Sequence, residues 1–188
     1  MHSLIIFASG KGSNATAIVD YFQANGKAKV ALIVTNKPDA GVLEMANDRH
    51  IPFLIVDRQT FGETLLVEQL KEYGPSMIVL AGFLWKIPET ILHSFPNRII
   101  NIHPALLPNY GGKGMYGQYV HEAVLTAGDL QSGITIHQVN EVYDAGNILL
   151  QARCPVQSGD TAATLAGRIH ALEHFYYPRT IAFLLDQL

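Results

Sequence analysis

Cysteine and charge are both scarce in this chain of 188 residues. Its one cysteine, Cys154, cannot form an internal disulfide, which fits a protein of a reducing compartment. Lys and Arg together number 13 and Asp and Glu 16, a formal net charge of −3, with no run of basic residues. This balance argues against nucleic acid or a membrane surface as a partner. With no signal-peptide pattern and no apolar run long enough to span a bilayer, we expect a soluble cytoplasmic protein.

Apolar sequence is abundant instead: hydrophobic residues make up 48% of the chain and charged residues 15%, which is typical of a compact α/β domain. Short β-branched runs alternate with amphipathic stretches, the runs at 4–8, 30–35, 53–56, 76–81 and 98–103 and the stretches near 14–25, 41–49, 61–73 and 88–95. This alternation predicts a doubly wound, mostly parallel central sheet with helices on both faces, a Rossmann-like fold, in one domain over 1–188. After Pro104 we expect a glycine-rich loop, a helix near 118–127, two more strands and a closing helix with Asp160 as its N-cap.

The first predicted strand breaks into the glycine-rich stretch SGKGSNA at residues 9–15. It is not a Walker A loop, because Lys11 precedes Gly12 and the lysine and hydroxyl are out of register. It matches the dinucleotide fingerprint, but the second strand ends in the sequence TNK, where that fingerprint needs an acid, and this weakens the match. Two other readings stay open. Gly12, Ser13 and Asn14 hold a monophosphate at the helix N-terminus, or Ser13 or Asn14 simply caps the helix.

The stretch NIHP at 101–104 is more informative. Alternate side chains of a strand share a face, so Asn101 and His103 are expected to point the same way. Pro104 ends the strand, which puts the pair at its carboxyl end, where open α/β sheets bind ligands. There the Asn101 amide can donate to a developing oxyanion and His103 can shuttle a proton. The alternative is that both satisfy buried backbone groups; their pairing beside a glycine-rich loop favours function.

Asp144 lies in a turn between the last two predicted strands. A carboxylate close to His103 would orient the imidazole and favour its protonated form. The alternative is a turn-forming residue without a chemical role. The remaining histidines show no metal-ligand spacing and Cys154 is isolated, so no metal site is expected. The absence of a G-x-S-x-G elbow argues against an acyl-enzyme mechanism.

The segments SGKGSN, VLAGFLWKIP, NIHPALLP, ITIHQVNEVYDAG and HALEH, in this order along almost the whole chain, resemble the glycinamide ribonucleotide formyltransferases. The resemblance implies a one-carbon transferase of purine biosynthesis. Such an enzyme moves the formyl group of its cosubstrate, 10-formyltetrahydrofolate, to the primary amine of glycinamide ribonucleotide, by direct attack through a tetrahedral intermediate and without a metal. Its partners would be these small molecules, and it would be a monomer or a homodimer.

The resemblance also implies roles for the residues that match its motifs. Asn101 would stabilise the oxyanion and His103 would donate the proton. Asp144 would keep His103 charged and oriented and help to order a water. The residues that would hold the ribonucleotide are Gly12, Ser13, Asn14, His170 and Glu173. The residues that would line the folate pocket are Leu84, Trp85, Lys86, Ile87, Asn140, Glu141, Val142 and Tyr143.

The chain departs from the family pattern at Trp85, where many relatives carry Arg, and at His170, where Gln is common. The loop YGGKGMYGQ is longer than in well-known relatives. Methionyl-tRNA formyltransferases add a basic tRNA-binding domain and formyltetrahydrofolate deformylases an N-terminal regulatory domain, and neither addition is expected here. Two alternatives remain: an N-formyltransferase acting on another amine, such as an amino-sugar nucleotide, and a non-catalytic nucleotide-binding module.

Overall fold

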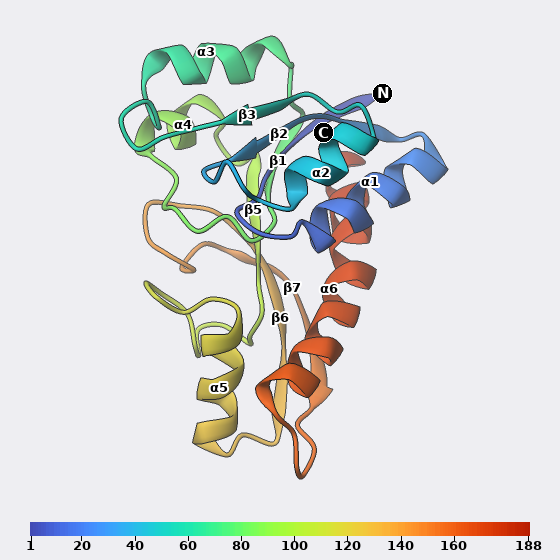
Figure 1. Cartoon of the computed structure of the whole chain (residues 1–188), viewed down its shortest axis with the longest axis vertical. Coiled ribbons are helices and arrows are strands. Elements are labelled where there is room, and N and C mark those ends of the chain that lie inside the picture. The colour runs from blue at the N-terminus through green and yellow to red at the C-terminus, as the bar shows by residue number, and fades with distance from the viewer.

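The computed structural model describes residues 1–188 and contains a seven-stranded sheet covered by helices (Figure 1). The strands are β1 (His2–Phe7), β2 (Ala28–Thr35), β3 (Phe53–Ile55), β4 (Met77–Leu80), β5 (Ile99–His103), β6 (Gln131–Gln138) and β7 (Ile148–Pro155). The helices are α1 (Ser13–Asn25), α2 (Val42–Asp48), α3 (Thr64–Glu72), α4 (Glu89–Ser94), α5 (Gln118–Ala127) and α6 (Ala162–Leu185).

The strands lie in the order β3-β2-β1-β4-β5-β6-β7. The pairings among β1 to β5 are parallel, whereas β6 runs antiparallel to both of its neighbours. The prediction of a mostly parallel α/β sheet is therefore confirmed. The order runs outward from β1 in both directions, so the gap between the carboxyl ends of β1 and β4 is the switch point where such sheets bind ligands.

The core has two layers because strand side chains alternate between the faces of the sheet. Leu4 and Ile6 join a cluster with residues of α1, α2 and α6, whereas Ile5 and Phe7 join a second cluster with residues of α3 and α4. Figure 1 shows these two groups of helices on opposite sides of the sheet. Full burial of such a side chain contributes about 1.5–3 kcal/mol. None of the helices combines the length and the apolar character needed to cross a membrane.

The closing helix, α6, begins one residue later than the sequence predicted. Thr161 is its N-cap: the Thr161 hydroxyl accepts from the Thr164 backbone N–H at 3.2 Å, and the Thr164 hydroxyl accepts from the Thr161 N–H at 2.9 Å. Asp160 accepts instead from the Gln157 N–H at 2.7 Å and pairs with Arg168. The prediction of Asp160 as the N-cap was wrong because the guanidinium and the preceding turn engage its carboxylate.

Tyr177 ties α6 to the sheet. Its side chain is fully buried, and its hydroxyl lies 2.9 Å from the carbonyl oxygen of Leu80 and 3.3 Å from that of Ile100. Leu80 ends β4 and Ile100 lies in β5, so one phenol O–H is shared between two neighbouring strands. The position of β5 is thereby fixed relative to α6.

β6 and β7 approach each other closely at Gly133, which makes a single methyl group disruptive there. A Cβ at Gly133 would lie 2.1 Å from the Ala152 carbonyl oxygen and 2.7 Å from Cδ2 of Leu106. We expect Gly133→Ala to lower the free energy of unfolding by about 1–3 kcal/mol, seen as a lower Tm in thermal unfolding. Gly167→Ala is the matched control, because a Cβ there meets nothing within 4 Å and alanine favours the helix. Equal Tm values for the two variants would contradict this packing.

Candidate active site

A cavity of about 950 Å³ opens at the carboxyl edge of the parallel strands. Its walls come from the loops after β1, β4 and β5, from the glycine-rich segment 112–117, from residues 137–144 and from α6. It therefore lies at the switch point of the sheet. Its volume is at the upper end of the range of small-molecule sites, about 300–1,000 Å³.

The glycine loop after β1 forms one end of this cavity. Gly12 is the N-cap of α1 with a φ of 80°, and a Cβ there would lie 2.7 Å from Cγ2 of Val42, so both the backbone conformation and the packing require glycine. No side chain caps α1, since Gly12 has none and the Asn14 amide is turned to Glu173. The capping role considered for Ser13 and Asn14 was therefore wrong. The free N–H groups and the dipole of the helix favour an anion at this point.

Where a dinucleotide site needs an acid, the structure holds an amide. Asn36, directly after β2, accepts a hydrogen bond from the Ser9 hydroxyl at 2.6 Å. The Ser9 oxygen in turn accepts from the Leu84 backbone N–H at 3.0 Å. Lys37 is the next residue of the cavity wall. These hydrogen bonds join the loops after β1, β2 and β4. No carboxylate stands directly after β2 to bind ribose hydroxyls, and this argues against a dinucleotide as the ligand.

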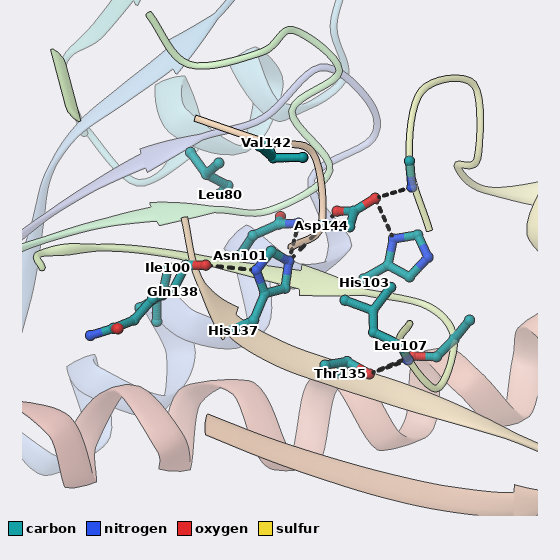
Figure 2. Close-up of polar contacts among 12 residues, drawn as sticks. Leu80, Ile100, Asn101, His103, Leu107, Thr135, His137, Gln138, Val142 and Asp144 are labelled. Carbon is teal, nitrogen blue, oxygen red and sulfur yellow. Dashed lines mark hydrogen bonds and ion pairs between the residues drawn. The ribbon is translucent and has the colours of Figure 1, made fainter. Parts of the chain in front are cut away.

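β5 presents Asn101 and His103 to the cavity from one face of the strand. Asn101 lies opposite His137 of β6 in the antiparallel pairing, and its Nδ2 is 3.2 Å from Nε2 of His137 (Figure 2). Nδ1 of His137 lies 2.8 Å from the Gln138 carbonyl oxygen. A carbonyl only accepts, so His137 carries its proton on Nδ1 and its Nε2 accepts from Asn101. This contact fixes the orientation of the Asn101 amide and leaves its second N–H free.

His103 is 3% exposed, and both of its ring nitrogens face a partner. Nε2 lies 2.7 Å from the Tyr110 carbonyl oxygen and therefore carries a proton. Nδ1 lies 3.6 Å from Oδ2 of Asp144, an ion-pair distance rather than a hydrogen bond (Figure 2). Burial lowers the pKa of His103 below its ordinary value, and the Asp144 charge and the Tyr110 carbonyl offset only part of that effect. The expectation that Asp144 keeps His103 charged stays a prediction: the carboxylate favours the protonated ring, and burial acts in the opposite direction.

Asp144 lies between two imidazoles. Its Oδ1 is 3.6 Å from Nε2 of His137, and its Oδ2, which faces His103, accepts a hydrogen bond from the Gly112 N–H at 2.9 Å. Burial by itself would raise the pKa of Asp144, but the two histidines and the Gly112 N–H together lower it below its ordinary value. Asp144 is thus an ionised carboxylate that links the turn after β6 to the glycine-rich segment.

Asn14, His170 and Glu173 form a further part of the cavity wall, where α1 meets α6. Asn14 Nδ2 donates to Oε2 of Glu173 at 2.9 Å. Glu173 is 6% exposed; burial raises the pKa of its carboxyl, while the Asn14 hydrogen bond and the His170 charge act against that rise. The His170 ring is exposed and lies parallel to that of His174, with the centroids 6.2 Å apart. This wall offers both donors and acceptors of hydrogen bonds.

An aromatic wall follows β4. Residues Leu84, Trp85, Lys86 and Ile87 all line the cavity, together with Phe83. The rings of Phe83 and Trp85 are 6.2 Å apart and both contact Phe61. The guanidinium of Arg58 lies 4.7 Å above the Trp85 ring. A cation therefore lies over Trp85 at this wall of the cavity.

The turn after β6 contributes Asn140, Val142 and Tyr143 to the cavity, but not Glu141. The Asn140 side chain accepts a hydrogen bond from the Val142 backbone N–H at 3.0 Å and so closes a tight turn. Glu141 lies at the outside of this turn and is exposed. Its assignment to the folate pocket stays a prediction.

Among the cavity residues that sequence reasoning missed are two histidines, His137 and His121. For His137 a signal existed, because strand alternation in ITIHQV places it two residues from Thr135 on one face. The register that sets it opposite Asn101 could not be read from the chain. For His121 only its place in an amphipathic helix was visible, and that pattern does not separate a core residue from a cavity residue.

The structure contains no group of three or more His, Cys, Asp or Glu placed to hold a metal ion.

The fold and the site together define a Rossmann-like α/β domain whose cavity combines an anion-favouring helix start with an amide, an imidazole and a carboxylate. A family model described as formyl transferase matches residues 2–181. The chain belongs to this formyl transferase family.

Named relatives are similar along nearly the whole chain. The chloroplastic phosphoribosylglycinamide formyltransferase of Arabidopsis thaliana is 41% identical over 191 residues, which cover 98% of this chain and 65% of that protein. The phosphoribosylglycinamide formyltransferase of Bacillus subtilis (strain 168) is 39% identical, with 98% and 95% covered. A crystal structure of glycinamide ribonucleotide transformylase 1 from Symbiobacterium toebii matches with a TM-score of 0.90 at 34% identity, covering 100% of this chain and 89% of that one. The chain spans only 65% and 61% of the length of the chloroplastic relatives from Arabidopsis thaliana and Vigna unguiculata.

Proposed function

We propose that the protein transfers the formyl group of 10-formyltetrahydrofolate to the primary amine of glycinamide ribonucleotide, by direct attack through a tetrahedral intermediate. The observation that carries this proposal is the meeting of Asn101, His103 and Asp144 at the wall of a cavity that also includes the start of α1. The names of the relatives support the choice of substrates.

Asn101 is the group suited to the developing oxyanion. Attack of an amine on a formyl carbon moves negative charge to the formyl oxygen, and a fixed N–H donor stabilises that charge best when it needs no reorientation. The contact with His137 holds the Asn101 amide in one orientation and leaves one N–H for the substrate oxygen. His137 would thus act as a positioning residue.

His103 is the group suited to moving the proton. Its Nε2 proton is engaged by the Tyr110 carbonyl, whereas Nδ1 has no short hydrogen bond. A proton lost by the attacking amine can be taken up at Nδ1, where the Asp144 carboxylate at 3.6 Å stabilises the imidazolium. Handing that proton to the departing nitrogen of the donor completes the transfer. Burial, which lowers the pKa of His103, favours this release.

The start of α1 would hold the phosphate of the acceptor. Gly12, Ser13 and Asn14 line the cavity, and the first-turn N–H groups lack a side-chain cap. His170 and Glu173 would contact the rest of the ribonucleotide. The cavity is also lined by more cations than carboxylates, which suits anionic substrates although the chain is net negative; the cations are Lys11, Lys37, Arg58, Lys86 and Lys113.

The aromatic wall and the turn after β6 would hold the folate cosubstrate. Flat rings pack well against an apolar wall that offers backbone groups at its edge, and segments 83–87 and 139–143 have this character. Arg58, which lies over the Trp85 ring, would offer the folate a cation at this wall. The residues present therefore fit the cosubstrate.

The test is a direct assay of the purified protein with glycinamide ribonucleotide and 10-formyltetrahydrofolate, followed by the absorbance of the folate product. We expect turnover that needs both substrates and that persists after treatment with a chelator. An amino-sugar nucleotide in place of glycinamide ribonucleotide is the comparison acceptor. Faster formylation of the sugar nucleotide would replace the proposed acceptor, and no formylation of either would favour a non-catalytic binding module.

Four expectations from the sequence stay predictions: a single domain over 1–188, a monomer or homodimer, a cytoplasmic location, and no nucleic acid or membrane as partner. Gel filtration with light scattering tests the second directly.

A further inference from the structure

α5 places one histidine at the cavity wall without a partner for its ring. His121 belongs to the buried face of α5 with Val120 and Val124. It is 2% exposed, lines the cavity, and its Nδ1 is buried with no hydrogen-bond partner. Buried polar atoms nearly always have a partner, so an unpaired one beside a ligand cavity needs an explanation.

A second unpaired atom lies in the same cavity wall. Oδ1 of Asn14 is buried without a partner, although Nδ2 of the same amide donates to Glu173. Asn14 and His121 hold two of the four unpaired buried side-chain atoms in the chain, and both residues line the cavity. This coincidence indicates that a bound molecule, rather than the protein, completes the hydrogen bonding of this wall.

The surroundings of His121 indicate which kind of chemical group the bound molecule offers to its ring. His121 lies within electrostatic reach of His170, in the wall formed with Asn14 and Glu173, and of His103. Burial, then these two histidines, lowers the pKa of His121 to about 4. The ring is therefore neutral near pH 7, with one N–H and one lone pair. A neutral ring of such low proton affinity suits a neutral polar group better than a phosphate, and it is a poor base for the amine.

We propose that His121 binds the acceptor substrate through a hydrogen bond to its neutral polar part, between the phosphate and the reacting amine. This inference rests on the proposed function. Two groups of glycinamide ribonucleotide have the required chemistry, the ribose hydroxyls and the amide. His121 is thus a binding residue that helps to hold the amine near His103, not a proton carrier.

Three substitutions at position 121 distinguish the contribution of each ring nitrogen to binding from that of the size of the side chain. His121→Leu removes both nitrogens, His121→Asn keeps a polar atom near the position of Nδ1, and His121→Gln reaches the position of Nε2. We expect His121→Leu to raise the KM for the acceptor by roughly 10- to 100-fold, the scale of one lost buried hydrogen bond, with the KM for the folate unchanged. One of the two polar variants should restore most of the affinity. Calorimetric titration with glycinamide ribonucleotide alone gives the same comparison without turnover.

An acceptor analogue without ribose hydroxyls identifies the group that is bound. If wild type and His121→Leu bind the analogue equally, the partner is a hydroxyl; if the difference persists, it is the amide. Wild-type affinity in His121→Leu would overturn the proposal. If His121→Leu does not fold, the Asn and Gln variants take its place. The proposal is then overturned if both variants bind the acceptor as tightly as the wild type does. A wild-type protein that does not formylate glycinamide ribonucleotide would instead defeat the proposed function.

Discussion

Replacing His103 by alanine is expected to reduce kcat by about 10²- to 10⁴-fold, the range that a positioned acid–base group supplies, while folate binding stays close to that of the wild type. Nδ1 of His103 faces the Asp144 carboxylate and makes no short hydrogen bond, whereas Nε2 of the same ring is engaged by the Tyr110 carbonyl. Without this imidazole, the proton of the attacking amine must pass to water. The measurement is steady-state turnover together with equilibrium binding of the folate.

His93→Ala is the matched control for this experiment. His93 lies in α4, is exposed, and does not line the cavity, so its loss removes an imidazole without touching the site. Its kcat should equal that of the wild type. A His103→Ala enzyme with near-normal turnover would remove His103 from the mechanism, and a large loss in the control would show that the assay reports on folding.

Asp144→Asn is expected to have the second largest effect, a loss of about 10²-fold or more in kcat at pH 7. The amide keeps the shape of the side chain and can still accept from the Gly112 N–H, but it removes the negative charge 3.6 Å from His103 Nδ1. Turnover requires that nitrogen to take up a proton, and without the carboxylate the resulting imidazolium is not stabilised.

The pH dependence of this variant has a definite sign. In the wild type the Asp144 charge raises the pKa of His103 against the larger lowering by burial. Removing the charge leaves only the Tyr110 carbonyl to act against burial, so the pKa of His103 falls further. The kinetic pKa of the imidazole in the pH–rate profile should therefore move to lower pH in Asp144→Asn. Asp39→Asn, at an exposed position outside the cavity, is the control and should keep the wild-type profile. An unshifted profile in Asp144→Asn would exclude electrostatic coupling.

Local signals in the chain were sufficient for the sheet and for β5. The run before Pro104 fixes where β5 ends, and strand alternation then puts Asn101 and His103 on one face. The glycine loop could likewise be placed after β1, because a strand, a turn and a helix follow each other directly. These features depend on neighbours in sequence, which is why they could be predicted.

The features that escaped prediction depend on distant neighbours. The role of His137 follows from the register between β5 and β6, which no local pattern sets. The N-cap of α6 shifted because Arg168, eight residues further on, draws away the Asp160 carboxylate. The lowered pKa of His103 reflects how deeply the finished fold buries it, a quantity that a charge partner alone does not determine.

The shared hydroxyl of Tyr177 has a mechanical consequence. Glu173 precedes Tyr177 by one turn of α6, and Asn101 directly follows Ile100, whose carbonyl the phenol contacts. Glu173, the proposed anchor of the acceptor, and Asn101, the proposed oxyanion donor, are therefore joined through one frame. The glycine-rich segment 111–117, with positive φ angles at Gly112, Gly114 and Gly117, is tied to the site by the hydrogen bond from the Gly112 N–H to Asp144. A substitution that moves Gly112 is therefore expected to displace Asp144 from His103, whereas the frame held by Tyr177 keeps its geometry.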